Sequence, residues 1–330
     1  MRALVLYGPG NLRLENVPEP EPESGWVKIR VRRVGICGTD KALYKGTYPP
    51  RKLPLIPGHE IAGEIIDVGS EDLEGLIGKR VTTEINVNCG KCWFCRHGMP
   101  THCSQRETLG ISLDGGMAEY VVTRADLLHP IDGLSWEEGA LVEPLAAVVE
   151  MLEMQPITPS ANAAVLGIGT IGLLAAQLLS LTTPNVIAVA REDSPKRRIA
   201  EKFVEVLTFD EALRYMEEKT PDGAGFDYVV EATGSPGGLG MALKLVRPRG
   251  VIAAKSTHGS PVTFDYTSMI VKEVRLVGSR CGPFEKAIDL IRSKMVDVES
   301  LVTSVHSLKD GVKAFERSFD RKEIKVQLEP

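Results

Sequence analysis

The hydrophobic pattern of the chain changes character near its middle. In roughly the first 140 residues, apolar positions come in short runs between Gly and Pro. Over residues 26–34, Val and Ile alternate with Lys and Arg, the period-two pattern of a half-buried strand. Residues 61–68 and 115–121 also favour strands, and no long helical pattern occurs. This part of the chain is predicted to be β-rich, and a short alternating stretch at 324–328 is expected to rejoin it.

In the second half, fully apolar runs alternate with helical stretches. This alternation predicts a complete doubly wound parallel sheet. The six predicted strands cover residues 163–166, 186–190, 204–209, 226–232, 250–254 and 274–278. Predicted helices cover 173–181, 195–202 with Ser194 as the N-cap, 286–295 and 309–318.

A chain of 330 residues is long enough for about two domains. The predicted division is a β-rich domain at 1–145, to which 290–330 returns, and a parallel-sheet domain at 146–289. With 43% apolar residues, 25% charged residues and a net charge of −5, the composition is that of a globular protein. It indicates neither nucleic-acid nor membrane binding. No signal-peptide or membrane-spanning run is seen, which favours the cytoplasm. Few Asn and Gln residues and mixed charges favour a thermophile.

The first candidate site joins the Gly35–Asp40 stretch, GICGTD, to PGHE at 57–60. Cys37, His59 and Glu60 offer a thiolate, an imidazole and a carboxylate, a set that suits Zn²⁺ with one coordination position open for water or substrate. Asp40 is expected to accept the remaining ring N–H of His59 and fix its tautomer. The alternative is a structural buried Cys and a core His.

Four of the six cysteines form a second candidate site. They fall within fifteen residues, at Cys89, Cys92, Cys95 and Cys103. Four thiolates on one short loop can complete a tetrahedral zinc shell with no open position, so a structural zinc is predicted. The alternatives are two disulfides, which a reducing compartment disfavours, and incidental cysteines.

Glu143 stands directly before Pro144 at a predicted helix start. Its carboxylate has two interpretations. It is either a favourable charge at the helix amino terminus or a neighbour and alternate ligand of the metal at Cys37 and His59.

The GIGTIG sequence at 167–172 follows a predicted strand and precedes a helix. That order places a dinucleotide pyrophosphate on the helix amino terminus. The residues predicted to bind it are Gly167, Gly169, Thr170, Ile171 and Gly172.

The end of the second strand of this sheet indicates which dinucleotide binds. An acidic residue normally holds the adenosine ribose there, but Ala190 takes that place and Arg191 follows. An Arg without the carboxylate suits a 2′-phosphate, so NADP(H) is predicted. Glu192 and Asp193 leave use of NAD open. Thr233, Gly234, Ser279 and Arg280 lie at later strand ends and are predicted to line the nicotinamide side.

These motifs, together with EATGS at 231–235, resemble the medium-chain, zinc-dependent alcohol dehydrogenase family over the whole chain. Val142–Leu145 is most similar to the polyol, threonine and glucose dehydrogenase branches. The resemblance implies a GroES-like (chaperonin-10-like) β-barrel interrupted by a Rossmann domain, and a homodimer or homotetramer.

The resemblance also assigns residues. It implies that Cys37, His59 and Glu60 bind a catalytic zinc with Glu143 close by, in addition to the structural zinc, and that Thr39 contacts the substrate hydroxyl. One departure is Ala42, which replaces a His that passes the alcohol proton to solvent in many relatives. Glucose dehydrogenases of the family share this absence.

The predicted function is reversible oxidation of a small secondary alcohol to a ketone with hydride transfer to NADP⁺. Within enzymes, the alternatives are an aldose 1-dehydrogenase and a threonine 3-dehydrogenase. From another class, the alternative is a non-catalytic cofactor-binding homologue resembling a lens crystallin. Intact Cys37, His59 and Glu60 argue against that class, and the missing His at Ala42 leaves it open.

Overall fold

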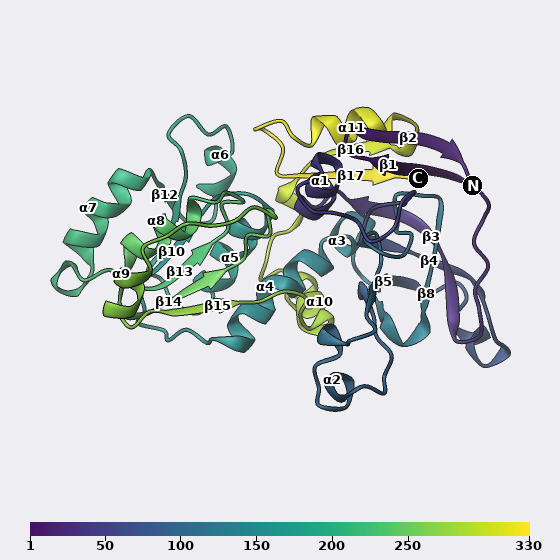
Figure 1. Cartoon of the computed structure of the whole chain (residues 1–330), viewed down its shortest axis with the longest axis horizontal. Helices are drawn as coiled ribbons and strands as arrows, with labels where there is room; N and C mark the ends of the chain where they lie inside the picture. The colour runs from purple at the N-terminus through teal and green to yellow at the C-terminus, as the bar shows by residue number, and fades with distance from the viewer. The chain divides into compact units, whose positions relative to one another are not determined.

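A computed structural model describes all 330 residues, which form two compact units (Figure 1). The first unit comprises Met1–Glu143, Ala287–Arg292 and Val302–Pro330, and the second comprises Pro144–Lys286 and Ser293–Leu301. The chain therefore leaves the first unit, builds the second and then returns. None of the helices is both long and apolar enough to cross a membrane.

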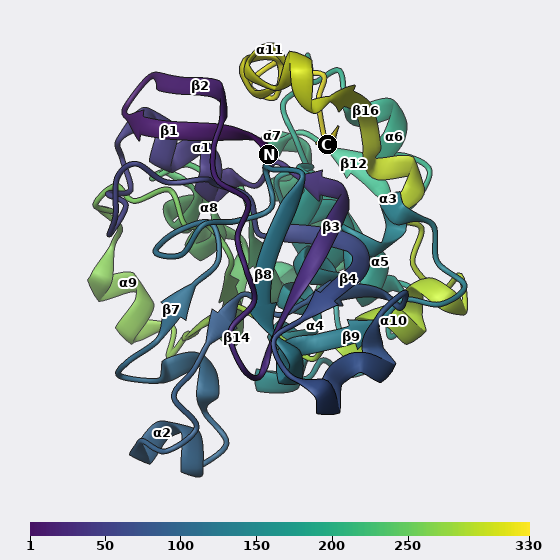
Figure 2. The same ribbon diagram turned by 90° about the vertical axis from the view of Figure 1, so that its right-hand side faces the viewer.

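The first unit is built on a seven-stranded sheet. Its order is β16-β17-β3-β4-β5-β9, and β8 pairs with β3. The strands are β3 (Trp26–Gly35), β4 (Glu60–Val68), β5 (Arg80–Thr83), β8 (Tyr120–Arg124), β9 (Leu128–Pro130), β16 (Val302–Ser307) and β17 (Lys325–Glu329). Figure 2 shows β8, β3 and β4 side by side. The strands predicted at 26–34, 61–68 and 324–328 are confirmed, and the last does rejoin this unit.

Smaller elements complete the first unit. Two two-stranded sheets pair β1 (Arg2–Gly8) with β2 (Asn11–Asn16) and β6 (Asn86–Val87) with β7 (Glu107–Thr108). The helices are α1 (Gly38–Lys45), α2 (Trp93–Arg96), α3 (Trp136–Gly139) and α11 (Gly311–Arg317). The alternating apolar positions of the strands form the core, where Val27, Ile29 and Ile65 of β3 and β4 are fully buried with Leu4 and Phe315.

The strand predicted at 115–121 begins later than expected, because its first residues bond to a loop instead of a strand. The backbone N–H groups of Gly115, Gly116 and Met117 donate to the carbonyls of Ile56, Gly58 and Pro57, respectively. A Cβ atom on Gly115 would lie 2.1 Å from the Gly58 carbonyl oxygen, so only glycine permits this approach. This segment therefore fixes the loop that precedes His59.

The second unit contains a six-stranded sheet in the order β12-β11-β10-β13-β14-β15, with every neighbouring pair parallel. The strands are β10 (Ala163–Leu166), β11 (Val186–Val189), β12 (Glu205–Leu207), β13 (Phe226–Glu231), β14 (Val246–Ala254) and β15 (Arg275–Gly278). Strands β10 and β11 are buried throughout, as expected for a sheet covered on both faces. The predicted doubly wound sheet is confirmed.

The helices of the second unit alternate with its strands. They are α5 (Thr170–Ser180), α6 (Arg197–Ala200), α7 (Phe209–Lys219), α8 (Gly238–Leu245) and α9 (Tyr266–Val271), while α4 (Val142–Met154) and α10 (Phe284–Arg292) each span a boundary between the two sequence ranges. Residues of α7 and α8 share a buried cluster with alternate residues of β10 and β11, so these two helices cover one face of the sheet.

The prediction for 195–202 was wrong in extent and cap. Helix α6 is one turn long, its N-cap is Lys196, and no side chain caps it. Ser194 instead lies in a turn, where its N–H donates to the Arg191 carbonyl and its own carbonyl accepts from Arg197 N–H. The helix therefore starts after the turn that Ser194 helps to close.

Candidate metal centre and cofactor-binding residues

Cys37 and His59 are brought together by the pairing of β3 with β4. Cys37 follows β3 and is the N-cap of α1, while His59 directly precedes β4. The antiparallel register pairs Gly35 with Glu60, so the two loops leave the same end of the sheet. Two motifs that are about twenty residues apart in sequence therefore meet at one point.

Asp40 joins the two loops. Its fully buried carboxylate accepts the Cys37 backbone N–H at 2.8 Å and the Gly58 backbone N–H at 3.1 Å. The His59 ring atom Nδ1 lies 3.7 Å from Asp40 Oδ1, too far for a hydrogen bond, and is a buried atom without a hydrogen-bond partner. The expected ring contact is therefore only electrostatic, and Asp40 instead anchors the backbone of both loops.

Burial and charge act in opposite directions on these two groups. Burial raises the pKa of Asp40, against the lowering effects of His59 and of the Cys37 N–H. Burial lowers the pKa of His59, but the charges of Asp40 and Cys37 outweigh it and hold that pKa well above its ordinary value. The imidazole must lose its proton to bind a metal, so metal binding here is coupled to proton release.

Glu60 has a partner that the sequence did not indicate. Both carboxylate oxygens lie 2.6 Å from the Lys325 ammonium nitrogen, and both side chains are buried. Lys325 also donates to the Ile36 carbonyl at 3.3 Å. A Cβ atom on Gly35 would lie 1.9 Å from Glu60 Oε2, so the glycine leaves the space that this carboxylate occupies. Lys325 occupies a polar position of the alternating terminal strand, so the pattern gave no signal that this side chain is buried.

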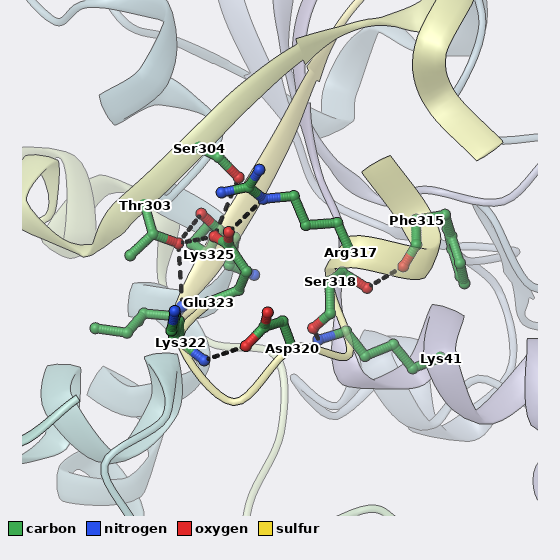
Figure 3. Close-up of polar contacts among 11 residues, drawn as sticks. Lys41, Thr303, Ser304, Phe315, Arg317, Ser318, Asp320, Lys322, Glu323 and Lys325 are labelled. Carbon is green, nitrogen blue, oxygen red and sulfur yellow. Dashed lines mark hydrogen bonds and ion pairs between the residues drawn. The ribbon is translucent and has the colours of Figure 1, made fainter. Parts of the chain in front are cut away.

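Lys325 reaches Glu60 from a strand end held by a second polar network. Figure 3 shows the Glu323 carboxylate surrounded by the side chains of Thr303, Ser304 and Arg317. Arg317 Nε donates to Glu323 at 2.6 Å and Ser304 Oγ donates at 3.0 Å, and Thr303 Oγ1 also bonds to this carboxylate. The network fixes the turn immediately before β17 and thereby the first residue of that strand.

Glu143 lies in the first turn of α4 and is 8% exposed. The charge of its carboxylate contributes to raising the pKa of both His59 and Lys325. Burial lowers the pKa of Lys325, but Glu60 and Cys37 outweigh it and the net shift is upward. The half-buried Cys37 and the buried His59, Glu60, Glu143 and Lys325 thus form one group whose charges act on one another.

The donor types at this site suit a zinc ion, but in the structure only the four cysteines described below form a group of three or more donors close enough to share one. Cys37 and His59 supply a soft sulfur and an imidazole, a buried carboxylate is available, and the orphaned His59 Nδ1 faces Asp40 as the outer nitrogen of a metal-bound His would. Thr39 lies half-buried in the first turn of α1. Ala42 is buried on the same helix and brings no polar group there.

The four cysteines of the second site are close enough to share one ion. Their sulfur atoms all lie within 4.8 Å of one another, and none forms a disulfide. A tetrahedral zinc with Zn–S bonds of about 2.3 Å places its sulfurs roughly 3.8 Å apart. Backbone N–H groups point at the sulfurs, from Cys89 to Cys103 Sγ and from Cys92 to Cys89 Sγ. The predicted disulfide alternative finds no support in this geometry.

The thiols of this cluster differ in acidity. The backbone N–H groups of Cys95 and Ser104 lower the pKa of Cys92 to about 6. Burial and the neighbouring Cys92 and Cys103 sulfurs raise the pKa of Cys95 to about 11. The first thiolate forms readily, and its negative charge then disfavours deprotonation of the neighbouring thiol. A cluster of this kind needs a bound cation to deprotonate fully.

The GIGTIG turn has the geometry of a phosphate-binding loop. Gly167 has a positive φ of 99°, and Gly169 is the N-cap of α5 with no side-chain cap. A Cβ atom on Gly172 would lie 1.9 Å from the Gly167 carbonyl oxygen, whereas one on Gly169 would meet nothing within 4 Å. Two glycines therefore serve the tight turn and the third leaves space in front of the helix amino terminus, beside Thr170 and Ile171.

The remaining predicted cofactor residues lie at the carboxyl ends of the strands. Ala190 follows β11 and is half-buried, and Arg191 is exposed. Another arginine of this region, Arg197, donates to the Val206 carbonyl at 2.7 Å and so is held by the protein itself. Thr233 and Gly234 follow β13, and Ser279 and Arg280 follow β15.

The comparisons with known proteins agree with this architecture. The model of the alcohol dehydrogenase GroES-like domain matches residues 23–133, and that of the glucose dehydrogenase C-terminus matches residues 137–329. Sorbitol dehydrogenase of Halalkalibacterium halodurans is 33% identical, over 100% of this chain and 99% of its own. D-arabinitol dehydrogenase 1 of Uromyces fabae is 30% identical, over 100% and 97%.

Solved structures agree as well. A chain of Sinorhizobium meliloti described as a zinc-binding dehydrogenase, with NADP bound, superposes with a TM-score of 0.89 at 28% identity, over 100% of this chain and 99% of its own. An alcohol dehydrogenase of Escherichia coli complexed with NADH gives 0.90 at 26%, with the same coverage. The chain belongs to the medium-chain, zinc-type alcohol dehydrogenase family, whose members are NAD(P)-dependent enzymes.

Proposed function

We propose that the protein interconverts a polyol or other small secondary alcohol and its ketone, with hydride transfer to and from NADP(H). The observation that carries this proposal is that the Asp40 carboxylate joins the loops of Cys37 and His59, while the charge of Glu143 acts on His59, in a chain of this family. A zinc ion held there would polarise a bound hydroxyl oxygen and lower its pKa.

Cys37 and His59 are the proposed protein ligands, with a carboxylate as the third. Glu60 and Glu143 both compete for that role. Because both oxygens of Glu60 are held by Lys325, Glu143 is favoured as the ligand, and Glu60 is favoured as a buried countercharge to the ammonium beside it. Cys89, Cys92, Cys95 and Cys103 are proposed to bind the second, structural zinc, giving two zinc ions per chain.

Thr39 is proposed to contact the substrate hydroxyl and to receive its proton. Ala42 cannot pass that proton on, so the proposed route runs through a cofactor ribose hydroxyl and water, or through Glu60 and Glu143. The half-buried position of Thr39 in the first turn of α1, two residues from Cys37, supports this role.

The proposed cofactor is NADP(H). Gly167, Gly169 and Gly172 shape the pyrophosphate site with the backbone of Thr170 and Ile171, while Thr233, Gly234, Ser279 and Arg280 line the nicotinamide side. Ala190 and the exposed Arg191 support selection of the 2′-phosphate. The relatives with bound NADP and bound NADH are both compatible with the fold, so the selection depends on these side chains.

The substrate class is proposed from the relatives. Their names include sorbitol, D-arabinitol and erythritol/L-threitol dehydrogenases. A second candidate is an aldose 1-dehydrogenase, which the match of residues 137–329 to a glucose dehydrogenase model supports. L-threonine 3-dehydrogenase of Thermococcus kodakarensis, at 30% identity over 97% of this chain and 93% of its own, supports a third.

A homodimer or homotetramer is proposed as the assembly. Strand β15 ends the parallel sheet, and its residues are largely exposed, with Leu276 at 42%. Tyr266 and Val271 of α9 are also exposed. Free edges of parallel sheets are normally covered, which supports contact with a second chain.

The experiment that tests the function is a substrate panel with the wild type and Cys37→Ala. Sorbitol, arabinitol, a simple secondary alcohol, glucose and threonine are each incubated with NADP⁺ or NAD⁺, and the reduced cofactor is read at its absorbance band. Cys37→Ala is expected to abolish turnover of the active substrate and to leave NADPH binding unchanged. Turnover that survives in Cys37→Ala would contradict a catalytic metal at this site.

A further inference from the structure

Lys255 is a charged side chain of the second unit that the proposed function does not use. It follows β14, and its ammonium donates to the Ala147 carbonyl at 2.7 Å, to the Ser279 carbonyl at 2.8 Å and to Ser279 Oγ at 3.0 Å. An ammonium has three N–H donors, and three acceptors are thus in place. The side chain is half-buried, and the charge of Lys255 also acts on the Glu150 carboxyl of α4.

The sheet register puts this contact at the cofactor edge. Glu231, Ala254 and Gly278 are aligned at the carboxyl ends of β13, β14 and β15. Lys255 and Ser279 are therefore each the first residue beyond that line. Ligands of doubly wound sheets bind outside this edge, so the Lys255–Ser279 contact lies where a dinucleotide is expected.

The carboxyl ends of β13 and β14 are held by a neighbouring network of hydrogen bonds around Glu231. The Glu231 carboxylate accepts the Thr233 N–H at 3.0 Å and the hydroxyls of Thr233 at 2.6 Å and Ser256 at 2.9 Å. Ser256 Oγ in turn accepts the Gly234 N–H at 2.9 Å. Glu231 thus fixes the loops after β13 and β14, and Lys255 extends the same restraint to the loop after β15.

We propose that Lys255 is a positioning residue for the nicotinamide end of the cofactor. By bonding to both the carbonyl and the hydroxyl of Ser279, its ammonium sets the conformation of the backbone after β15, which then presents fixed groups to the nicotinamide carboxamide. Lys255 does not itself touch the cofactor, because its three donors are directed at protein oxygens. The proposal rests on the dinucleotide site of the proposed function.

The chain contains a matched control for this chemistry. Lys272 also directs its ammonium at backbone carbonyls, of Leu243 at 2.9 Å and Val246 at 3.0 Å. Leu243 lies in the last turn of α8 and Val246 begins β14, at the opposite, amino end of the strand. Removing either ammonium deletes the same type of bond from the same unit, but only Lys255 faces the cofactor edge.

The experiment compares two ligands that differ only in the nicotinamide. Dissociation constants of NADPH and of 2′-phospho-ADP-ribose are measured by calorimetry for the wild type, Lys255→Met, Lys255→Arg and Lys272→Met. Lys255→Met is expected to weaken NADPH binding by about tenfold, the size of one hydrogen bond lost between the displaced backbone after β15 and the nicotinamide carboxamide, and to leave 2′-phospho-ADP-ribose binding unchanged. Lys255→Arg should recover part of the loss, and Lys272→Met should change neither constant. Lys255→Gln replaces the Met variant if the latter does not fold.

Three outcomes would overturn the inference. Lys255→Met could weaken the binding of NADPH and of 2′-phospho-ADP-ribose equally, or it could weaken the binding of neither ligand. The third outcome is that Lys272→Met weakens NADPH binding selectively, as is expected of Lys255→Met. Turnover of an alcohol by the wild type separates the proposed function from the proposed role of Lys255. If turnover occurs and Lys255→Met has the same ratio of the two dissociation constants as the wild type, only the role of Lys255 is contradicted. A wild type that binds neither ligand contradicts the proposed function as well.

Discussion

The Lys325 ammonium, at the start of β17, lies 2.6 Å from each carboxylate oxygen of Glu60, at the start of β4. It also donates to the Ile36 carbonyl in the loop between β3 and α1. Lys325 and Glu60 are 265 positions apart in the chain, and both are almost completely buried. A buried ion pair of this kind is costly to break, because removing one partner leaves the other charge without compensation.

Replacing Lys325 by Met is therefore expected to lower the free energy of unfolding by about 3–5 kcal/mol. The double variant Glu60→Gln/Lys325→Met should be less destabilised than the sum of the two single variants, because no buried charge is left unpaired. Urea unfolding of the four proteins measures this coupling. Additive losses would show that the pair does not interact energetically.

The Glu323 network before β17 should make stability depend on pH. Burial raises the pKa of Glu323, but hydrogen bonds from Thr303, Arg317 and Ser304 outweigh it and hold the pKa below its ordinary value. A depressed folded-state pKa contributes stability that is fully present above the unfolded pKa of about 4.3, and that is lost as the pH falls through the lower folded value.

Glu323→Gln is expected to be less stable than the wild type at pH 7, and the difference should shrink as the pH falls below about 4. Chemical unfolding at pH 7, 5, 4 and 3 measures it. Asp320→Asn is a control on the same turn, where the carboxylate accepts the Lys322 backbone N–H (Figure 3). A difference that stays constant with pH would mean that Glu323 is not held ionised by its neighbours.

Cys103→Ser is expected to reduce the bound zinc from two ions to one per chain. Cys103 is the buried member of the four-cysteine cluster, and its sulfur accepts backbone N–H groups from Cys89 and Gln105. Loss of a thiolate opens a tetrahedral shell that the lobe needs for its own folding. Metal analysis of the purified variant measures the stoichiometry.

Cys281→Ser is the control for that experiment, because Cys281 follows β15 and lies outside the cluster. It should keep both zinc ions. Equal zinc content in the wild type and Cys103→Ser would show that the four sulfurs do not bind a resident metal.

Arg191→Asp is expected to reverse the cofactor preference. The exposed guanidinium follows the second strand of the parallel sheet in sequence, where a carboxylate would instead accept the ribose hydroxyls of NAD(H). NADPH binding should weaken by about tenfold or more, and NADH binding should hold or improve. Fluorescence titrations with both reduced cofactors measure the ratio of the NADPH and NADH dissociation constants.

Arg198→Asp makes the same charge change at an exposed residue of α6 and should leave the ratio near that of the wild type. If both variants changed the ratio of the NADPH and NADH dissociation constants equally, Arg191 would act only through its general charge and not through a specific contact with the 2′-phosphate. Tighter binding of NADH than of NADPH by the wild type would overturn the predicted preference itself.

The sequence by itself determined the parallel sheet and the local parts of each site. Short, fully apolar runs that alternate with helical stretches are typical of the buried strands of a covered sheet, and the glycines at 167–172 and the four cysteines act within one turn or one loop. Local periodicity and local spacing are enough for such features. The start of α6 was predicted wrongly. Whether Ser194 caps a helix or lies in a turn depends on its hydrogen bonds, and the hydrophobic pattern of the sequence carries no information about them.

Only the tertiary structure decided which charges meet. The pairing of Glu60 with Lys325, the bond from the Gly58 N–H to the Asp40 carboxylate, and the Lys255 contact with Ser279 each join segments that a sheet brings together. A lone Lys in a strand has the same local pattern whether it faces solvent or a buried carboxylate. Its partner is fixed by which strands lie side by side, and that depends on the packing of the whole unit.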